Sequence, residues 1–365
     1  MRKNIFLLIV CLAILLTANI FAQEEKNGTS GFFVTPELSV WGLGAIAGYR
    51  FSGFLSDNMD TIPYVGVKGG YFYDNYYRLP DGSVFSHPTA GYNAEDSSYS
   101  YWLLSWQSGL IQSFLSEGKH DYIGLDLSYK GELRNNINDA KKNELLFSSD
   151  IPEKNASLSS FLKASFFINY RLPHPVHQYV QGAYAEVWYL TMPDTMGSAP
   201  GGSLSYSAFG ADTSYAFTAF DSDTGKNEFC IVVAVHAGGE YVYGDAIPFY
   251  SKGYAWEYIR GADGHGLDTL ASLAANAEVR FYFPSPGIIA NLAIWPVLYI
   301  FSDNGYFWDD APSDGTQVST AGAGFALEFA PVLVLSMSTQ WRLTDTNIDG
   351  TKWVPIKISL GSYLF

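Results

Sequence analysis

The amino-acid sequence predicts an all-β fold, a transmembrane antiparallel up-and-down β-barrel, and three observations support this prediction. Apolar and polar side chains alternate with a period of two along most of the 365 residues, which puts them on opposite faces of strands. The links between these segments switch between short and long, as in barrels with short turns on one side of a membrane and long loops on the other. The segments also span ten to seventeen residues, more than the ~5 to 6 residues of strands in soluble sheets.

The first 22 residues are typical of an export signal. Arg2 and Lys3 precede an apolar core, and Ala22 is a small residue before a polar segment. A retained single-span anchor is the alternative, although the apolar run is shorter than the ~20 residues that a spanning helix needs. We therefore expect a signal peptide over 1–22, a short N-terminal segment over 23–31 and a barrel over 32–365.

About fourteen strands account for the barrel segment, with twelve or sixteen as the alternatives, because bacterial barrels have an even number. The least distinct boundaries lie between the first two strands and in the eighth, which Gly210 and Asp212 interrupt. We expect Tyr363 and Phe365, at the end of the last strand, to form a C-terminal sorting signal. The strands cover residues 32–42, 43–52, 62–74, 99–115, 121–132, 157–171, 178–190, 204–220, 229–243, 268–283, 288–303, 317–329, 331–342 and 353–365.

The polar faces of two of these strands supply candidate luminal residues. In the segment 268–283, Asn276, Glu278 and Arg280 share one face, and the opposite face is apolar. In the segment 288–303, Asp303 lies opposite an apolar row in the same way. Since alternate residues of a strand point to opposite sides of a sheet, these polar side chains are expected to face the inside of the barrel.

Composition excludes several classes of function. The chain has 21 Lys and Arg against 36 Asp and Glu, and a formal net charge of -15 repels phosphate backbones, so we expect no nucleic-acid partner. Only Cys11 and Cys230 are present, and Cys11 lies in the signal, so no disulfide framework is available. No motif for a phosphate-binding loop or a nucleophilic serine occurs, and we expect neither an enzyme nor a cofactor.

Five short motifs lie in the C-terminal third, at residues 244–250, 258–261, 276–281, 301–305 and 322–324. Four residues of the strand motifs are Phe301, Gly305, Gly322 and Gly324. Together the motifs resemble the bacterial outer-membrane insertase superfamily, which includes BamA, TamA and the two-partner-secretion transporters and is often labelled bacterial surface antigen. They occur in the family's order and extend the resemblance over about residues 228–365.

The resemblance implies that the long sixth loop folds back into the lumen and carries an Arg-Gly tip. Arg260 and Gly261 match that tip, and Glu278 and Asp303 match the acidic partners of the arginine on the inner wall. The alternation of polar residues independently puts both carboxylates on inward faces. Because only about ten residues separate the signal from the first strand, we expect a short, barrel-only member of the superfamily without periplasmic modules.

A weaker pattern concerns calcium. Asp345, Asn347 and Asp349, followed by Gly350, match the opening of a calcium loop, in which alternate oxygen ligands surround the cation. The twelfth position is Ile356 rather than a glutamate, so an acidic hairpin tip is the preferred interpretation and no metal is expected.

The expected function is a role in outer-membrane protein or lipid assembly or translocation. The implied partners are outer-membrane lipid and nascent outer-membrane proteins, and the implied location is the bacterial outer membrane. The alternative is a passive pore or a surface-exposed binding protein that uses the long acidic loops.

Overall fold

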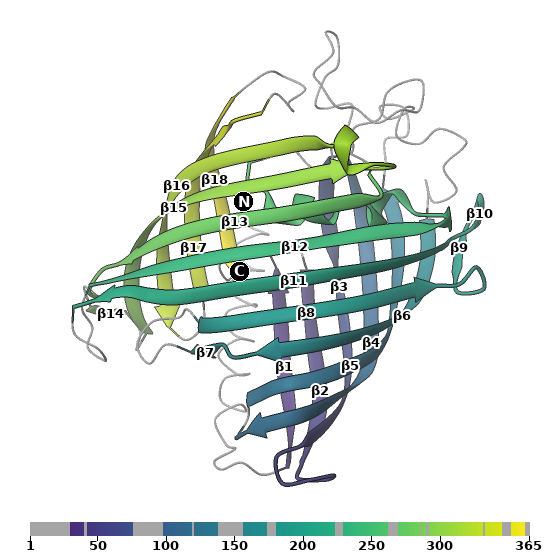
Figure 1. The fold of residues 1–365 in the computed structure, drawn as a ribbon, viewed down its shortest axis with the longest axis horizontal. Coiled ribbons are helices and arrows are strands. Elements are labelled where there is room, and N and C mark those ends of the chain that lie inside the picture. Colours follow the sequence, from purple (N-terminus) through teal and green to yellow (C-terminus); the bar gives the residue numbers. More distant parts are fainter. Residues whose placement is uncertain are drawn as a thin grey trace.

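The strands form one antiparallel sheet that curls into a barrel (Figure 1). The computed structural model describes residues 30–39, 42–75, 98–118, 120–137, 156–173, 180–222, 229–261, 269–285, 287–289, 292–330, 333–344 and 352–361. Among these residues, fourteen strands have nine residues or more. They are β1 (Gly31–Ser39), β2 (Gly42–Ser52), β3 (Asp60–Asn75), β4 (Ser98–Glu117), β5 (His120–Ile137), β6 (Ala156–Asn169), β8 (Val180–Met192), β11 (Ser205–Asp221), β12 (Cys230–Ala246), β13 (Ala271–Tyr282), β15 (Leu292–Trp308), β16 (Thr316–Ala330), β17 (Leu333–Arg342) and β18 (Trp353–Gly361).

Each long strand pairs antiparallel with the next long strand along the chain, which is the up-and-down topology that the sequence predicts. The remaining described elements are short and lie in the links. They are β7 (Leu172–Pro173), β9 (Gly197–Ala199), β10 (Gly202–Ser203), β14 (Gly287–Ile289) and three 3-10 turns, η2 (Phe249–Ser251), η3 (Tyr254–Tyr258) and η4 (Pro312–Asp314). Throughout the described ranges, no helix is both long enough and apolar enough to cross a membrane.

The predicted fold class and strand number are confirmed, including the two least distinct boundaries. β1 and β2 are separate strands with two residues between them. β11 runs through Gly210 and Asp212 without a break. Both residues lie on the inner face of the strand. Gly210 lies opposite Trp188 and leaves room for its ring, and Asp212 points into the lumen.

Some strand ends differ from the prediction. β5 extends to Ile137 and β15 to Trp308, five residues beyond the predicted ends at 132 and 303 in each case. Both extensions point toward long loops, where hairpin arms continue to exchange backbone hydrogen bonds after the apolar alternation has ended. Strand β18 is described to Gly361, so the last four residues of the predicted strand lie outside the described ranges.

Side-chain burial follows the predicted alternation most clearly in β13. Asn276, Glu278 and Arg280 are buried, whereas Leu273 is half exposed on the opposite face. The same holds in β15, where Ile300 is half exposed and Asp303 is fully buried. The polar faces therefore line the lumen, and the apolar faces form the outer surface that hydrocarbon covers in a membrane barrel.

Short and long links lie at opposite ends of the barrel. Figure 1 shows β7 and β14, which belong to short links, at one end and β9 and β10, which belong to a long link, at the other. This arrangement agrees with the alternation of link lengths in the sequence.

The first and last strands approach each other at the seam of the barrel. Cα atoms of β1 and β18 approach within 8 Å, yet no hydrogen-bonded register joins the two strands among the residues that the structure describes. The ladder between β17 and β18 is itself interrupted, because its register shifts between Ser338 and Gln340. Two residues of β18, Pro355 and Ile356, lie opposite the single residue Thr339 at this point, which is the arrangement of a β-bulge.

Candidate functional site

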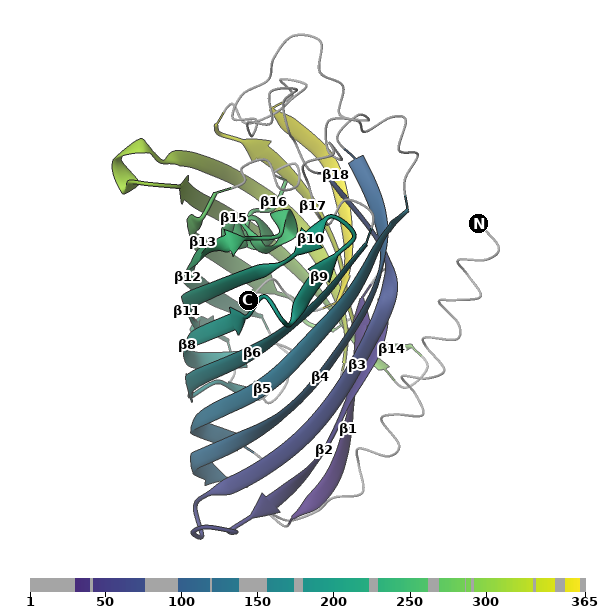
Figure 2. The ribbon, with the colours of Figure 1, turned by 90° about the vertical axis from the view of Figure 1, so that its right-hand side faces the viewer.

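Residues 247–261 of the link between β12 and β13 lie inside the barrel and carry the candidate site (Figure 2). They contain η2 and η3, and η3 begins after Gly253, whose φ of 76° is a left-handed conformation that glycine adopts without strain. We call the described residues 247–261 the luminal loop.

Apolar packing holds the second half of the luminal loop against the inner wall. Trp256 stacks on Phe307 of β15 with 4.5 Å between ring centroids. Ala255 and Ile259 are buried in the same cluster, which includes Val318 of β16. Burial of this much apolar surface favours the inward position of the loop, since the same side chains would otherwise face water.

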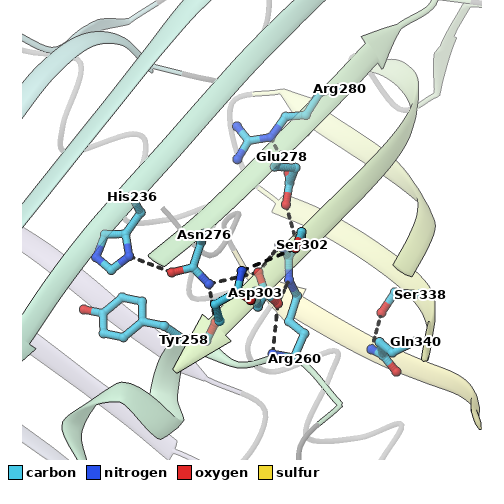
Figure 3. Close-up of polar contacts among 11 residues, drawn as sticks. His236, Tyr258, Arg260, Asn276, Glu278, Arg280, Ser302, Asp303, Ser338 and Gln340 are labelled. Atoms are coloured by element: carbon cyan, nitrogen blue, oxygen red, sulfur yellow. Dashed lines mark hydrogen bonds and ion pairs between the residues drawn. The ribbon is translucent and has the colours of Figure 1, made fainter. Parts of the chain in front are cut away.

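Arg260 lies at the end of this packed segment and contacts two carboxylates of the wall (Figure 3). Its Nε donates to Asp303 Oδ2 over 2.8 Å and its Nη2 donates to Asp303 Oδ1 over 2.9 Å, so the contact is a two-pronged ion pair. Its Nη1 donates to Glu278, and its backbone N–H donates to Asp303 over 3.0 Å. One arginine therefore bridges β13 and β15, as the planar guanidinium allows and a lysine does not.

A second arginine completes the cluster. Arg280 Nε donates to Glu278 Oε1 over 2.5 Å, so Glu278 accepts from guanidinium groups on both sides. The Glu278 and Asp303 side chains are 1% and 0% exposed. Two guanidinium groups and two carboxylates have no net charge, which lets the group tolerate burial that an unpaired charge would not. We call Arg260, Glu278, Arg280 and Asp303 the Arg260 cluster.

Gly261 connects the cluster to β17. Its φ of 78° is left-handed, and a Cβ atom there would lie 2.8 Å from the Cβ of Gln340, so a larger residue would be both strained and crowded. The carbonyl of Gly261 accepts a hydrogen bond of 2.5 Å from Arg342 Nε. The loop tip is thus attached to β13, β15 and β17.

The four strand-motif residues, in β15 and β16, lie in the part of the barrel wall beneath this tip. Phe301 lies opposite Gly322 across the β15–β16 ladder, and a Cβ on that glycine would meet the phenyl ring. The Arg260 guanidinium lies 3.6 Å above the centroid of the same ring, a cation–π contact. Gly324 leaves room for the Tyr299 ring in the same way, and Gly305 leaves room for the side chain of Ile259 in the loop.

A polar network beside the cluster was not anticipated from the sequence. Asn276 donates to Asp303 over 2.9 Å and to the backbone carbonyl of Tyr258 over 2.6 Å. His236 lies 2.8 Å from the Asn276 side-chain oxygen and 2.8 Å from Asp212, and it stacks on the Tyr258 ring. Tyr254 and Tyr258 both donate to Asp212, and burial raises the pKa of both tyrosines, which keeps the hydroxyls protonated.

The alternation of inward-facing and outward-facing positions along each strand is the sequence signal that could have indicated this network. Asp212, His236 and Asn276 all occupy inward positions of adjacent strands, as the alternation indicates. Their contact depends on the register between those strands, which alternation leaves undetermined.

Other predicted residues lie outside the described ranges. These are the signal segment, Tyr363 and Phe365 at the C-terminus, and the calcium candidates Asp345, Asn347 and Asp349. Among the described residues, no group of three or more His, Cys, Asp or Glu side chains is arranged to hold a metal ion.

Two solved structures are similar to this chain. BamA from Haemophilus ducreyi, lacking POTRA domains 1–3, aligns with a TM-score of 0.46 and 15% identity over 92% of this chain and 70% of that chain. CdiB from Escherichia coli aligns with a TM-score of 0.46 and 12% identity over 91% of this chain, which spans 55% of CdiB. No family model matches the sequence, and no curated protein matches it.

Proposed function

We propose that this chain is an outer-membrane β-barrel of the insertase type that assists the assembly or translocation of membrane proteins or lipids. The observation that carries the proposal is the inward-folded loop whose Arg260 binds Asp303 and Glu278. The sequence motifs over about residues 228–365 support it as well, because four of the five, residues 258–261, 276–281, 301–305 and 322–324, contribute side chains or glycines to this cluster or to the wall beneath it.

The proposed mechanism requires no catalytic group. β1 and β18 are the first and last strands of the sheet, and their Cα atoms approach within 8 Å, so we assign the entry of a further strand to the seam between them. A strand edge that is exposed there can accept a further strand by β-augmentation. In this proposal the Arg260 cluster fixes the shape of the wall from β13 to β17, which ends next to β18, and the seam supplies the variable part.

Crosslinking in living cells tests the proposal. A photoactivatable residue at Ile356 of β18, which is 70% exposed, should crosslink to newly exported outer-membrane proteins. The same probe at Val187 of β8, which is 55% exposed on the outer face, is the matched control. If the probe at Ile356 gives no crosslinks to newly exported proteins, or if the probe at Val187 gives as many, a role of the seam in assembly is not supported.

The alternative function, a passive pore or surface-exposed binding protein, makes a different prediction. Several charged side chains line the lumen, including Lys163 and Glu186, whose charged groups lie 3.0 Å apart. A passive pore should conduct ions steadily in planar bilayers, whereas an assembly factor with a filled lumen should conduct little. Steady conductance of the unmodified barrel, together with no client crosslinks from Ile356, would favour the pore.

A further inference from the structure

The first half of the luminal loop reaches a different part of the wall from the second half. Tyr250, in η2, is the residue that makes this contact. Its hydroxyl lies 2.9 Å from the hydroxyl of Ser157 and 2.9 Å from that of Ser159, both in β6. Its ring also lies 4.0 Å from the guanidinium carbon of Arg134 in β5.

Arg134 contacts a second ring in addition to that of Tyr250. The guanidinium lies between two rings, with 4.0 Å to the centroid of Tyr250 and 4.0 Å to the centroid of Tyr101 in β4. Arg134 is buried, with 8% of its surface exposed. Cation–π contacts strengthen when the cation is removed from water, so this sandwich holds the Tyr250 ring in one position.

The two attachments are far apart around the barrel. Tyr250 is fixed to β5 and β6, whereas Arg260 is fixed to β13 and β15. Three strands, β8, β11 and β12, separate these two parts of the wall. The nine residues between the attachments, 251–259, therefore pass along the inner side of these three strands, where Tyr254 lies against Trp188 and donates to Asp212.

A cavity of about 370 Å³, lined by both polar and apolar side chains, lies between this segment and the wall. The loop contributes Ser251, Gly253 and Tyr254 to its lining, and the wall contributes Glu132 of β5 and Glu240 of β12. The loop thus forms one side of this cavity.

We propose that Tyr250 is a second luminal anchor, and that Tyr250 and Arg260 together hold residues 250–260 as a strap that limits ion passage through the barrel. Removal of the Tyr250 anchor frees the first half of the strap and widens the open space between the strap and β5 and β6. The Arg260 cluster stays intact because its contacts lie on other strands. This inference does not depend on the identity of any client, so it can fail while the proposed assembly role holds.

Conductance of the purified full-length barrel in planar bilayers is the first test. Tyr250→Ala should raise single-channel conductance several-fold, since pore width and lining set ion flow. Tyr250→Phe keeps the stack on Arg134 and loses the bonds to β6, so it should give a smaller rise. Tyr215→Ala, which removes a ring from the outer face, is the matched control and should leave conductance unchanged. Wild-type conductance in Tyr250→Ala would overturn the proposal.

Photocrosslinking is the second test, and it does not require Tyr250→Ala to fold. A benzophenone side chain at position 250 has the length to reach β6 and should crosslink to the peptide that contains residues 156–169. The same group at position 215 should not. Folded barrels that crosslink from position 250 only to peptides of β12 or β13 would show that the first half of the loop does not cross the lumen, which would also overturn the proposal.

Discussion

Removal of the Arg260 side chain gives the sharpest test of the cluster geometry. In Arg260→Ala, Asp303 loses both of its bonds to the guanidinium, and Glu278 loses one donor. Asp303 keeps the Asn276 side chain and the backbone N–H of residue 260, and Glu278 keeps Arg280. The carboxylate most affected is Asp303, which is 0% exposed.

The expected cost follows from these losses. Breaking a buried ion pair by removing one partner costs roughly 3 to 5 kcal/mol. The donors that remain on both carboxylates put this case at the lower end, about 3 kcal/mol of unfolding free energy. Arg260→Lys should recover only part of the loss, because one ammonium group cannot bridge Asp303 and Glu278. The barrel should still form, since its ladder hydrogen bonds are unchanged.

Urea-induced unfolding of the barrel in lipid vesicles measures this difference. Arg171→Ala is the matched control, because Arg171 stacks on Tyr184 and hydrogen bonds to Asn169 near a short link, far from the cluster in the chain. A disulfide between cysteines at positions 260 and 303, in a Cys230→Ser background, should also form in folded barrels. If Arg260→Ala shifts unfolding no more than the control does, and the disulfide does not form, the reasoning about the cluster is refuted.

Three other predictions concern topology, calcium and packing. Cysteine labelling of intact cells should reach a probe at Asn138, in a long loop, but not one at Gly118, in a short turn; the opposite pattern would invert the topology. Chelation of calcium should leave the unfolding temperature unchanged, and a drop of several degrees that Asp345→Ala abolishes would contradict this. Gly322→Val should destabilise the barrel by about 1 to 3 kcal/mol through overpacking against Phe301, and full stability in a heat-modifiability assay would show that the ring can move aside.

The sequence predicts the strands well because alternation is a local property. The period of two assigns Glu278 and Asp303 to inward faces before any contact is known, and the structure agrees. The family resemblance then supplies Arg260 as their partner. Local signals also explain the strand boundaries, since turn residues and loss of alternation mark them.

Contacts between strands require register, which alternation alone does not give. Asn276 and Asp303 are direct cross-strand neighbours, and so are Phe301 and Gly322, yet a shift of two residues would preserve every inward face and break both pairs. The path of the luminal loop is harder still, because it depends on tertiary packing. Nothing local to Tyr250 indicates that its partners lie in β5 and β6.

The bulge in β18 has a consequence for how the last strand leaves the sheet. Pro355 has no amide hydrogen, and the bulge divides the β17–β18 ladder into a run at Trp353 and Val354 and a longer run that begins at Lys357. The two runs of the ladder can open separately, and the opening of one run exposes fewer backbone amides than the opening of a continuous ladder would. Amide protons of the longer run should therefore exchange as a group separate from those beside the loops, so that the final strand can detach at one end while it remains attached at the other.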